Sequence, residues 1–313
     1  MIDATLVSGF LGAGKTTWLA EHLRRHEDGV DLVVVNDFAD QGVDDALLRE
    51  AAWEAGARVE PIVGGCLCCD RDGALRRVLH AEIGRRHRGD AARDGRVVVE
   101  TSGLAEPHRI TRMLADDPVL RTNLSLRSLV VVVDGLGGRR LLRHRHGVRD
   151  QVAVADRVVL SRADLARHGE LEELAATVRR LNATAELVAS TLGTERPVTP
   201  ADPAVADVFD DDGTVAEPDV RSCRVDLAEG TSWAEYALWL DTMCRAHPDR
   251  LLRSKGIVPT RDGRLLVQSM GGDVATPVPA PPGVDTGMVF VLDRIDPDAL
   301  VRSLRTHVPS AGA

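Results

Sequence analysis

The chain has 313 residues, and at about 100–200 residues per domain this length suggests two domains. Its formal net charge of −9 argues against a dedicated nucleic-acid binder, which normally presents a basic face. No apolar run reaches the length of a membrane span, and the first predicted strand begins almost at the N-terminus, so we expect a cytoplasmic protein without a signal peptide or membrane contact. Five cysteines in that compartment are interpreted as metal ligands or thiols before disulfides.

The first motif in chain order is a glycine-rich segment at 9–16 that fits the phosphate-binding pattern G-x-x-x-x-G-K-[ST]. A short strand is predicted before it at 4–7 and a helix after it at 17–23, which disfavours the alternative of a glycine-rich turn with a solvated lysine. The glycines let successive N–H groups point into one concavity, and Lys15 supplies charge to the β- and γ-phosphates. The hydroxyl of Thr16 supplies a Mg²⁺ ligand. The predicted nucleotide contacts here are Gly9, Gly12, Ala13, Gly14, Lys15, Thr16 and Thr17.

Strand-like and helical patterns then alternate. β-branched runs predict strands at 32–35, 96–99, 129–133, 157–160 and 185–188. Helical patterns lie between them at 73–86, 108–115 and 165–182, and the arginine pairs at 76–77 and 85–86 are interpreted as solvated helix faces. Strands separated by helices form a parallel sheet covered on both faces. We therefore expect residues 1–190 to form an α/β domain, a doubly wound P-loop NTPase fold with a mostly parallel sheet.

Three of the cysteines fall within four residues: Cys66, Cys68 and Cys69, directly after two glycines. On a regular strand their side chains would alternate, but a turn at the glycines lets them converge. Thiolates suit Zn²⁺, Cu(I) or related ions. Three ligands leave a tetrahedral ion one position short, which suits a metal that is handed on or that takes its last ligand from elsewhere. Buried or redox-sensing thiols without a metal remain the alternative.

Two acidic residues stand at the ends of predicted strands, where the carboxyl ends of parallel strands meet the phosphate site. Asp37 is expected to hold the Mg²⁺ shell or to orient the attacking water. Glu100 is expected to reach Mg²⁺ or its waters, and Gly103 to approach the γ-phosphate. Either acid taken alone would more often be an ordinary loop residue, but at a strand end beside a P-loop a site role is equally compatible with each. With Lys15, these two acids are the predicted catalytic residues.

The composition changes after residue 190. Residues 191–222 are rich in Pro, Asp, Thr and Ala with little periodicity, which predicts a linker. Beyond it a strand, a helix, three further strands and a closing helix are predicted at 223–227, 233–246, 256–258, 265–268, 288–292 and 297–307. A Pro/Gly-rich loop is predicted at 271–287. This order favours a small α+β domain over 223–313 with a mostly antiparallel sheet.

Together these motifs resemble the CobW-type metal-chaperone GTPases, P-loop proteins related to the nickel-insertion GTPases of urease and hydrogenase maturation. The resemblance rests on residues 9–17, 36–38, 64–69, 100–107 and 151–156, and on 252–256 with Gln268 in the C-terminal part. Its most specific feature is Gly-Gly-Cys-Leu-Cys-Cys behind a P-loop. It implies binding of GTP, Mg²⁺ and a transition metal (Zn²⁺ or Co²⁺), slow hydrolysis to GDP, and metal delivery to a client metalloprotein under control of the nucleotide.

One segment departs from that family. Where its members carry Asn-Lys-x-Asp for guanine, this chain has Ser161-Arg162-Ala163-Asp164. The Asp164 carboxylate can accept from guanine N1–H and N2–H₂, whereas adenine has an acceptor at N1 and no N2 donor. Ser161 is too short for all the contacts of an Asn, and Arg162 has to stack in place of the Lys. We expect the GTP preference to survive with affinity weakened by about ten- to a hundredfold, with ATP preference as the alternative.

The combined hypothesis is that triphosphate and Mg²⁺ order the segment at 36–44 and, through it, the cysteine segment at 64–69. Two other functions remain open: an ATP-dependent small-molecule kinase with a structural metal, and a nucleotide-switched interaction protein without metal. No acceptor-site motif supports the kinase. The sequence leaves open which metal is carried, which protein is the client and whether the chain forms a homodimer.

Overall fold

The computed structural model describes residues 1–25, 29–36, 43–62, 73–92, 94–103, 105–167, 169–201, 220–248, 250–270, 273–274, 276–280 and 286–312. The chain divides into two compact units, Met1–Val215 and Ala216–Ala313. Across the described ranges, no helix combines the length and the apolar character needed to cross a bilayer.

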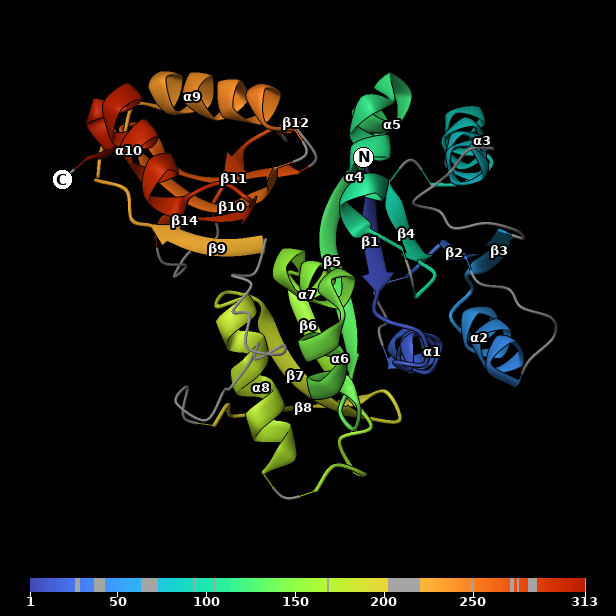
Figure 1. Cartoon of the computed structure of the whole chain (residues 1–313). Coiled ribbons are helices and arrows are strands. Elements are labelled where there is room, and N and C mark those ends of the chain that lie inside the picture. The colour runs from blue at the N-terminus through green and yellow to red at the C-terminus, as the bar shows by residue number, and fades with distance from the viewer. Residues whose placement is uncertain are drawn as a thin grey trace. The chain divides into compact units, whose positions relative to one another are not determined.

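The first unit is built on a sheet that, over the described residues, has eight strands in the order β3-β2-β4-β1-β5-β6-β7-β8 (Figure 1). Their bounds are β1 (Ile2–Ser8), β2 (Leu32–Asn36), β3 (Arg58–Ile62), β4 (Gly95–Glu100), β5 (Leu124–Asp134), β6 (Arg157–Ser161), β7 (Glu186–Thr191) and β8 (Thr194–Pro197). Strands β1 to β7 are parallel, and β8 is antiparallel to β7. The predicted mostly parallel α/β sheet is thus confirmed.

Helices connect the parallel strands. They are α1 (Lys15–Arg25), α2 (Val43–Glu54), α3 (Ala74–Arg88), α4 (Pro107–Asp116), α5 (Pro118–Asn123), α6 (Gly138–His144), α7 (His146–Val154) and α8 (Glu170–Leu181). The chain crosses the sheet in one direction from β1 to β3 and in the other from β3 to β7. Right-handed crossovers therefore place α1 and α2 on one face and α3 to α8 on the other, as in Figure 1.

The core under α1 and α2 explains why the β-branched runs become central strands. Trp18 and Leu19 of α1 and Leu48 of α2 pack on buried valines of the sheet, among them Val33 and Val132. A strand covered by helices on both faces needs apolar side chains in both directions, so these runs are continuous rather than alternating.

Two strands at the edges of the sheet, β3 and β8, were not predicted from the sequence. β3 (RVEPI) is half-buried, contains Pro61 and pairs with β2 alone among the described strands, so it carries no apolar run. β8 (TERP) lies inside the predicted linker at 191–222 and is polar for the same reason. It follows a two-residue turn in which Leu192 has φ 49° and Gly193 has φ 86°. Such positive φ values are typical of tight β-hairpins.

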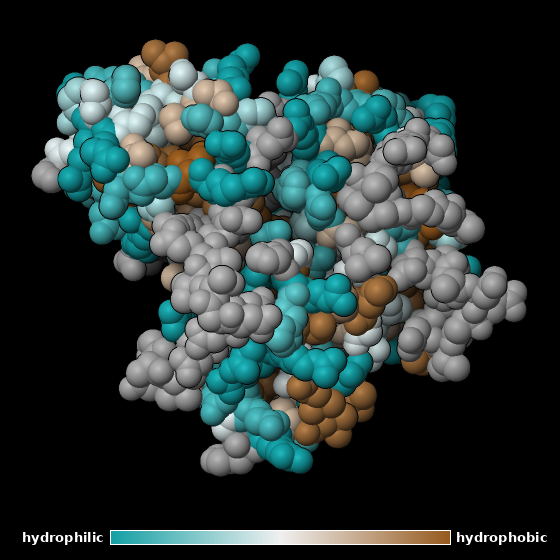
Figure 2. Space-filling view, viewed as in Figure 1, coloured by the Kyte–Doolittle hydropathy of each residue, from teal (hydrophilic) through white to brown (hydrophobic). Residues whose placement is uncertain are grey.

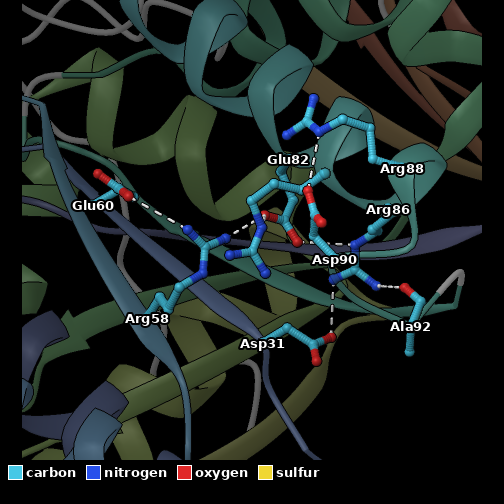
Figure 3. A network of polar contacts seen from close by, with 9 residues as sticks. Asp31, Arg58, Glu60, Glu82, Arg86, Arg88, Asp90 and Ala92 are labelled. Atoms are coloured by element: carbon cyan, nitrogen blue, oxygen red, sulfur yellow. Dashed lines mark hydrogen bonds and ion pairs between the residues drawn. The ribbon is translucent and has the colours of Figure 1, made fainter.

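A buried polar network holds α3 against the sheet (Figure 3). Glu82 and Arg86 are one turn apart on α3, their side chains are each 2% exposed, and they pair at 2.9 Å. Arg86 also reaches Asp31 at 3.0 Å and the carbonyl of Ala92 at 2.8 Å. Glu82 accepts a hydrogen bond from Arg58 at the start of β3. The interpretation of Arg86 as a solvated residue was therefore wrong, because its side chain is buried and pairs with the carboxylates of Glu82 and Asp31.

The second unit has, within its described residues, a six-stranded antiparallel sheet in the order β12-β11-β10-β14-β9, with β13 on β11. Its elements are β9 (Val220–Val225), α9 (Trp233–Ala246), β10 (Leu251–Thr260), β11 (Gly263–Met270), β12 (Asp273–Val274), β13 (Val278–Pro279), β14 (Gly287–Asp293), α10 (Pro297–His307) and η3 (Pro309–Ala311). Both long helices cover one face (Figure 1). Tyr236, Trp239 and Phe290 fill the core between helices and sheet. The α+β prediction is confirmed, while β12 and β13 lie where a loop was predicted.

Candidate nucleotide-binding site

The glycine-rich segment forms a turn between β1 and α1 at the carboxyl end of the sheet. Gly9, Gly12 and Gly14 all have positive φ, at 138°, 72° and 84°. A Cβ atom at Gly9 would lie 2.2 Å from the carbonyl oxygen of Val132, so the turn passes directly over β5. The turn closes through a hydrogen bond from the N–H of Ala13 to the carbonyl of Phe10, at 3.1 Å. This backbone is suited to bind an anion, because its N–H groups are hydrogen-bond donors and the turn leads into the N-terminus of α1, the positive end of the helix dipole.

Lys15 is the first residue of α1, and only 7% of it is exposed. Its Nζ donates to the carbonyls of Gly9 and Phe10, at 3.1 and 3.3 Å. The ammonium group is thus folded over the concave side of the turn. A buried lysine charge in this position is suited to pairing with a phosphate.

Two predicted site residues, Thr16 and Glu100, are in direct contact. The Thr16 hydroxyl donates to Oε1 of Glu100 at 2.7 Å. Glu100 is the last residue of β4 and is 3% exposed, and its strand lies beside β1 with Glu100 in register with Val7. A hydroxyl and a carboxylate at this distance are hard oxygen donors of the kind that Mg²⁺ prefers.

The segment after β4 lies against the phosphate turn. A Cβ atom at Gly103 would lie 2.3 Å from the backbone nitrogen of Leu11, so only a glycine fits there. Thr101 is fully buried and donates to the hydroxyl of Ser8 at 3.1 Å. From the other side, the buried Gln151 of α7 donates to the carbonyl of Ala105 at 2.8 Å. The segment is therefore held between the phosphate turn and α7.

The predicted base-recognition segment also reaches the phosphate turn. The Ser161 hydroxyl donates to the carbonyl of Ala13 at 2.7 Å, so this short side chain does make a contact within the turn. Arg162 has a φ of 51°, rare for a residue with a side chain, and its Nη2 donates to the carbonyl of Gly12. Asp164 is exposed, so its carboxylate is accessible to a ligand.

Three exposed leucines follow β5, β6 and β7, the strands at this part of the sheet. Leu136 follows β5, Leu165 follows Asp164, and Leu192 lies in the turn after β7, each with about half or more of its surface exposed. Figure 2 shows hydrophobic side chains gathered over this end of the first unit. Apolar side chains beside an exposed carboxylate provide a surface for a flat ring that is read at its edge.

Sequence reasoning missed Asp134, which ends β5 and forms an ion pair with Arg162 at 3.4 Å between Oδ1 and Nη1. Its position at the end of a buried valine run was the available signal, the same signal that selected Glu100. Four predicted residues, Asp37, Cys66, Cys68 and Cys69, lie outside the described residues. Within the described part, His, Cys, Asp and Glu form no group of three suited to a metal ion.

The structure describes the chain on both sides of the cysteine segment, up to Ile62 and from Gly73 onwards. Ile62 ends β3 and Gly73 precedes α3. Ile62 is in register with Asn36, the last residue of β2, and Val35 is in register with Glu100. The carboxyl ends of β2, β3 and β4 are thus adjacent in the sheet.

Comparison with known proteins gives consistent results for both units. Residues 3–189 match the CobW/HypB/UreG nucleotide-binding domain, and residues 220–308 match the cobalamin synthesis protein CobW C-terminal domain. The zinc chaperone YjiA of Escherichia coli K12 is 28% identical to this chain, in an alignment that covers 86% of this chain and 86% of YjiA. The zinc chaperone CobW of Pseudomonas aeruginosa is 30% identical over 52% of this chain and 49% of its own.

A solved structure has the same fold. The crystal structure of the Zn(II)-bound YjiA GTPase from E. coli superposes with a TM-score of 0.65 at 22% identity, covering 98% of both chains.

Proposed function

Because the chain belongs to the CobW/HypB/UreG family, we propose that it is a GTPase metallochaperone, which binds and slowly hydrolyses GTP and delivers Zn²⁺ to a client metalloprotein. The observation that carries the proposal is the contact of the Thr16 hydroxyl with the Glu100 carboxylate, beside Lys15 in a phosphate turn. The zinc-chaperone and GTPase relatives support the choice of cargo and nucleotide. Co²⁺ remains the second candidate cargo, and the cytoplasm the proposed compartment.

Thr16 and Glu100 are the residues proposed to hold Mg²⁺. Both offer oxygen atoms, which fits a hard cation, and both sit where a β- or γ-phosphate would meet the N-terminus of α1. When bound, Mg²⁺ neutralises charge that develops on the transferring phosphoryl group. The sequence-predicted Asp37 is proposed to share this site or to orient the attacking water.

The chain's own groups then have separate tasks. The N–H groups of the turn cradle the phosphates, and the Lys15 ammonium exchanges its bonds to Gly9 and Phe10 for bonds to phosphate oxygens. Gly103, which lies against Leu11, is the backbone position proposed to meet the γ-phosphate. Loss of that phosphate on hydrolysis changes the contacts of the segment that carries Gly103.

Base recognition is proposed to fall to Ser161, Arg162 and Asp164. The exposed Asp164 carboxylate accepts from the guanine edge, while Ser161 and Arg162 fix the segment on the carbonyls of Ala13 and Gly12. A carboxylate partner for guanine N1–H and N2–H₂ disfavours adenine, because adenine would leave the carboxylate without donors.

The cargo is proposed to bind to Cys66, Cys68 and Cys69, since thiolates suit Zn²⁺ and three of them leave one position for a ligand from the client. Coupling to the nucleotide is proposed to run along the edge of the sheet, because Asn36 and Ile62 are in register and open the two segments concerned.

The test is one anaerobic preparation in which metal content and the dissociation constants for GTP and ATP are measured together. We expect tighter binding of GTP than of ATP, release of inorganic phosphate without transfer to a small-molecule acceptor, and about one Zn²⁺ that is lost in the triple variant Cys66→Ser, Cys68→Ser, Cys69→Ser. Equal constants for the two nucleotides would remove the guanine assignment. A wild type that retains no metal would leave a nucleotide-switched interaction protein instead.

A further inference from the structure

A carboxylate that the proposed function does not use lies beside the base-recognition segment. Asp134 ends β5 and is in register with Ser161 at the end of β6. Its Oδ1 lies 3.4 Å from Nη1 of Arg162. The same carboxylate accepts the backbone N–H groups of Leu136 and Gly137, at 3.3 and 3.2 Å. Asp134 is therefore fixed in place by the turn that leads into α6, before any ligand binds.

Arg162 directs its two terminal nitrogens to different partners. Nη1 faces Asp134, and Nη2 donates to the carbonyl of Gly12 in the phosphate turn. The planar guanidinium can make both contacts at once, whereas the single ammonium of a lysine has no such fork. The positive φ of Arg162 costs backbone energy, and these two contacts offset it.

We infer that Asp134 is a positioning residue for the nucleobase. It holds Arg162 against the phosphate turn, so that the guanidinium and its stem form one wall of the site that takes the guanine ring. It also keeps the guanidinium from pairing with Asp164, two residues further along, whose carboxylate the guanine edge requires. The inference rests on the proposed GTP binding and concerns affinity for the base, not for the phosphates.

The test compares two ligands on four proteins. GTP and inorganic tripolyphosphate, which has no base, are titrated into the wild type, Asp134→Asn, Arg162→Ala and the double variant. We expect each single variant to bind GTP about 10-fold more weakly and to bind tripolyphosphate as the wild type does. Asp134→Asn removes the ion pair that holds Arg162, and Arg162→Ala removes the guanidinium itself. The double variant should bind GTP no more weakly than Arg162→Ala, since the two side chains act as one unit.

The matched control is Asp3→Asn. Asp3 pairs with Arg127 at 2.8 Å near the opposite end of β5, so the same type of ion pair is lost far from the phosphate turn, and GTP affinity should not change. Arg162→Ala keeps the bonds of Asp134 to the α6 turn and so tests the inference even if Asp134→Asn unfolds.

Three results would overturn the inference while GTP binding by the wild type stands. They are unchanged GTP affinity in both single variants, equal weakening of GTP and tripolyphosphate, and additive losses in the double variant. A wild type that binds tripolyphosphate but shows no preference for GTP over ATP would instead remove the proposed function, and this inference with it.

Discussion

Asn36 and Ile62 are register partners at the adjacent carboxyl ends of β2 and β3. Asn36 directly precedes the segment that contains Asp37, and Ile62 precedes the segment that contains the three clustered cysteines. The residues that precede these two segments are therefore joined by one rung of a parallel ladder. This relationship is the physical basis for expecting nucleotide and metal to affect each other.

The first prediction concerns this coupling. Zn²⁺ affinity should differ about 5- to 150-fold between the protein loaded with a non-hydrolysable GTP analogue and the protein loaded with GDP. By linkage, Zn²⁺ must change the ratio of the affinities for the analogue and GDP by the same factor. Titrations of each ligand in the presence of the other measure both factors. Identical Zn²⁺ affinities in the two nucleotide states would show that the sites are independent.

The second prediction concerns the Thr16–Glu100 contact. Glu100→Gln keeps the shape but removes the charge, and should lower GTP hydrolysis by about 10- to 100-fold, with a higher Mg²⁺ concentration needed for half-maximal rate. Asp94→Asn is the matched control, because Asp94 precedes the opposite end of β4 and pairs with the N-terminal amine. The measurement is the initial rate of GTP hydrolysis over a series of Mg²⁺ concentrations. An unchanged Mg²⁺ dependence in Glu100→Gln would contradict the proposal that Glu100 helps to hold Mg²⁺.

The third prediction concerns Gly103. A Cβ atom there would lie 2.3 Å from the backbone nitrogen of Leu11, so Gly103→Ala must push the phosphate turn and the segment after β4 apart. Nucleotide affinity should fall at least about 10-fold, because a displaced turn loses its alignment with the phosphates. Gly147→Ala, where nothing lies within 4 Å, should bind nucleotide as the wild type does. Normal affinity in Gly103→Ala would mean that the two segments separate without cost.

The fourth prediction concerns the buried pair of Glu82 and Arg86. Arg86→Met leaves the Glu82 charge buried with less compensation, and should destabilise the first unit by about 3–5 kcal/mol. Asp90→Asn, which breaks an exposed pair with Arg88 at the end of the same helix, should cost less than about 1 kcal/mol. Urea unfolding of the full chain, followed at the transition of the first unit, compares the two. Similar midpoints for both variants would show that burial of the pair contributes little.

The fifth prediction concerns the cysteines of the second unit. Burial, with the nearby Asp298 carboxylate, raises the pKa of Cys223 from 9.0 to about 11, and Cys244 is fully buried. At pH 8 the thiolate fraction of Cys223 is then about 100-fold below that of an unperturbed thiol, so iodoacetamide should modify Cys223 of the folded protein far more slowly than it modifies the same residue in the urea-unfolded chain. Peptide mass spectrometry after timed quenching identifies the modified positions.

The same shift sets the sign of a pH dependence. A folded pKa above the unfolded one means that the contribution of the Cys223 thiol to stability is complete below pH 9.0 and is lost as the pH rises towards about 11. The second unit should become less stable across this interval, and Cys223→Ser should reduce the slope.

Short sequence patterns predicted those features that depend on neighbouring residues in the chain, namely the buried strands and the phosphate turn. Valine runs identify strands that are buried on both faces, and the spacing of Gly9, Gly14 and Lys15 identifies the phosphate turn. The carboxylate at the end of a strand was sufficient to select Glu100, which the fold brings to Thr16.

Features that depend on distant partners were not predictable in this way. The burial of Arg86 depends on Asp31, 55 positions away, and the role of Asp134 depends on Arg162 in the next strand's loop. β8 is fixed by contacts of Trp18 with Glu195 and of Arg25 with Thr194, which no short window contains. These contacts form between residues that the sheet brings together, so they can be identified only when the order of the strands is known.

The outermost position of β3 has a mechanical consequence. Among the described strands it has β2 as its single neighbour, so within the sheet a displacement of Ile62 acts first on the β2 ladder, at its pair with Asn36. In the proposed function, any signal that passes through the sheet from the cysteine segment to the phosphate turn must therefore cross β2, which lies between β3 and β4.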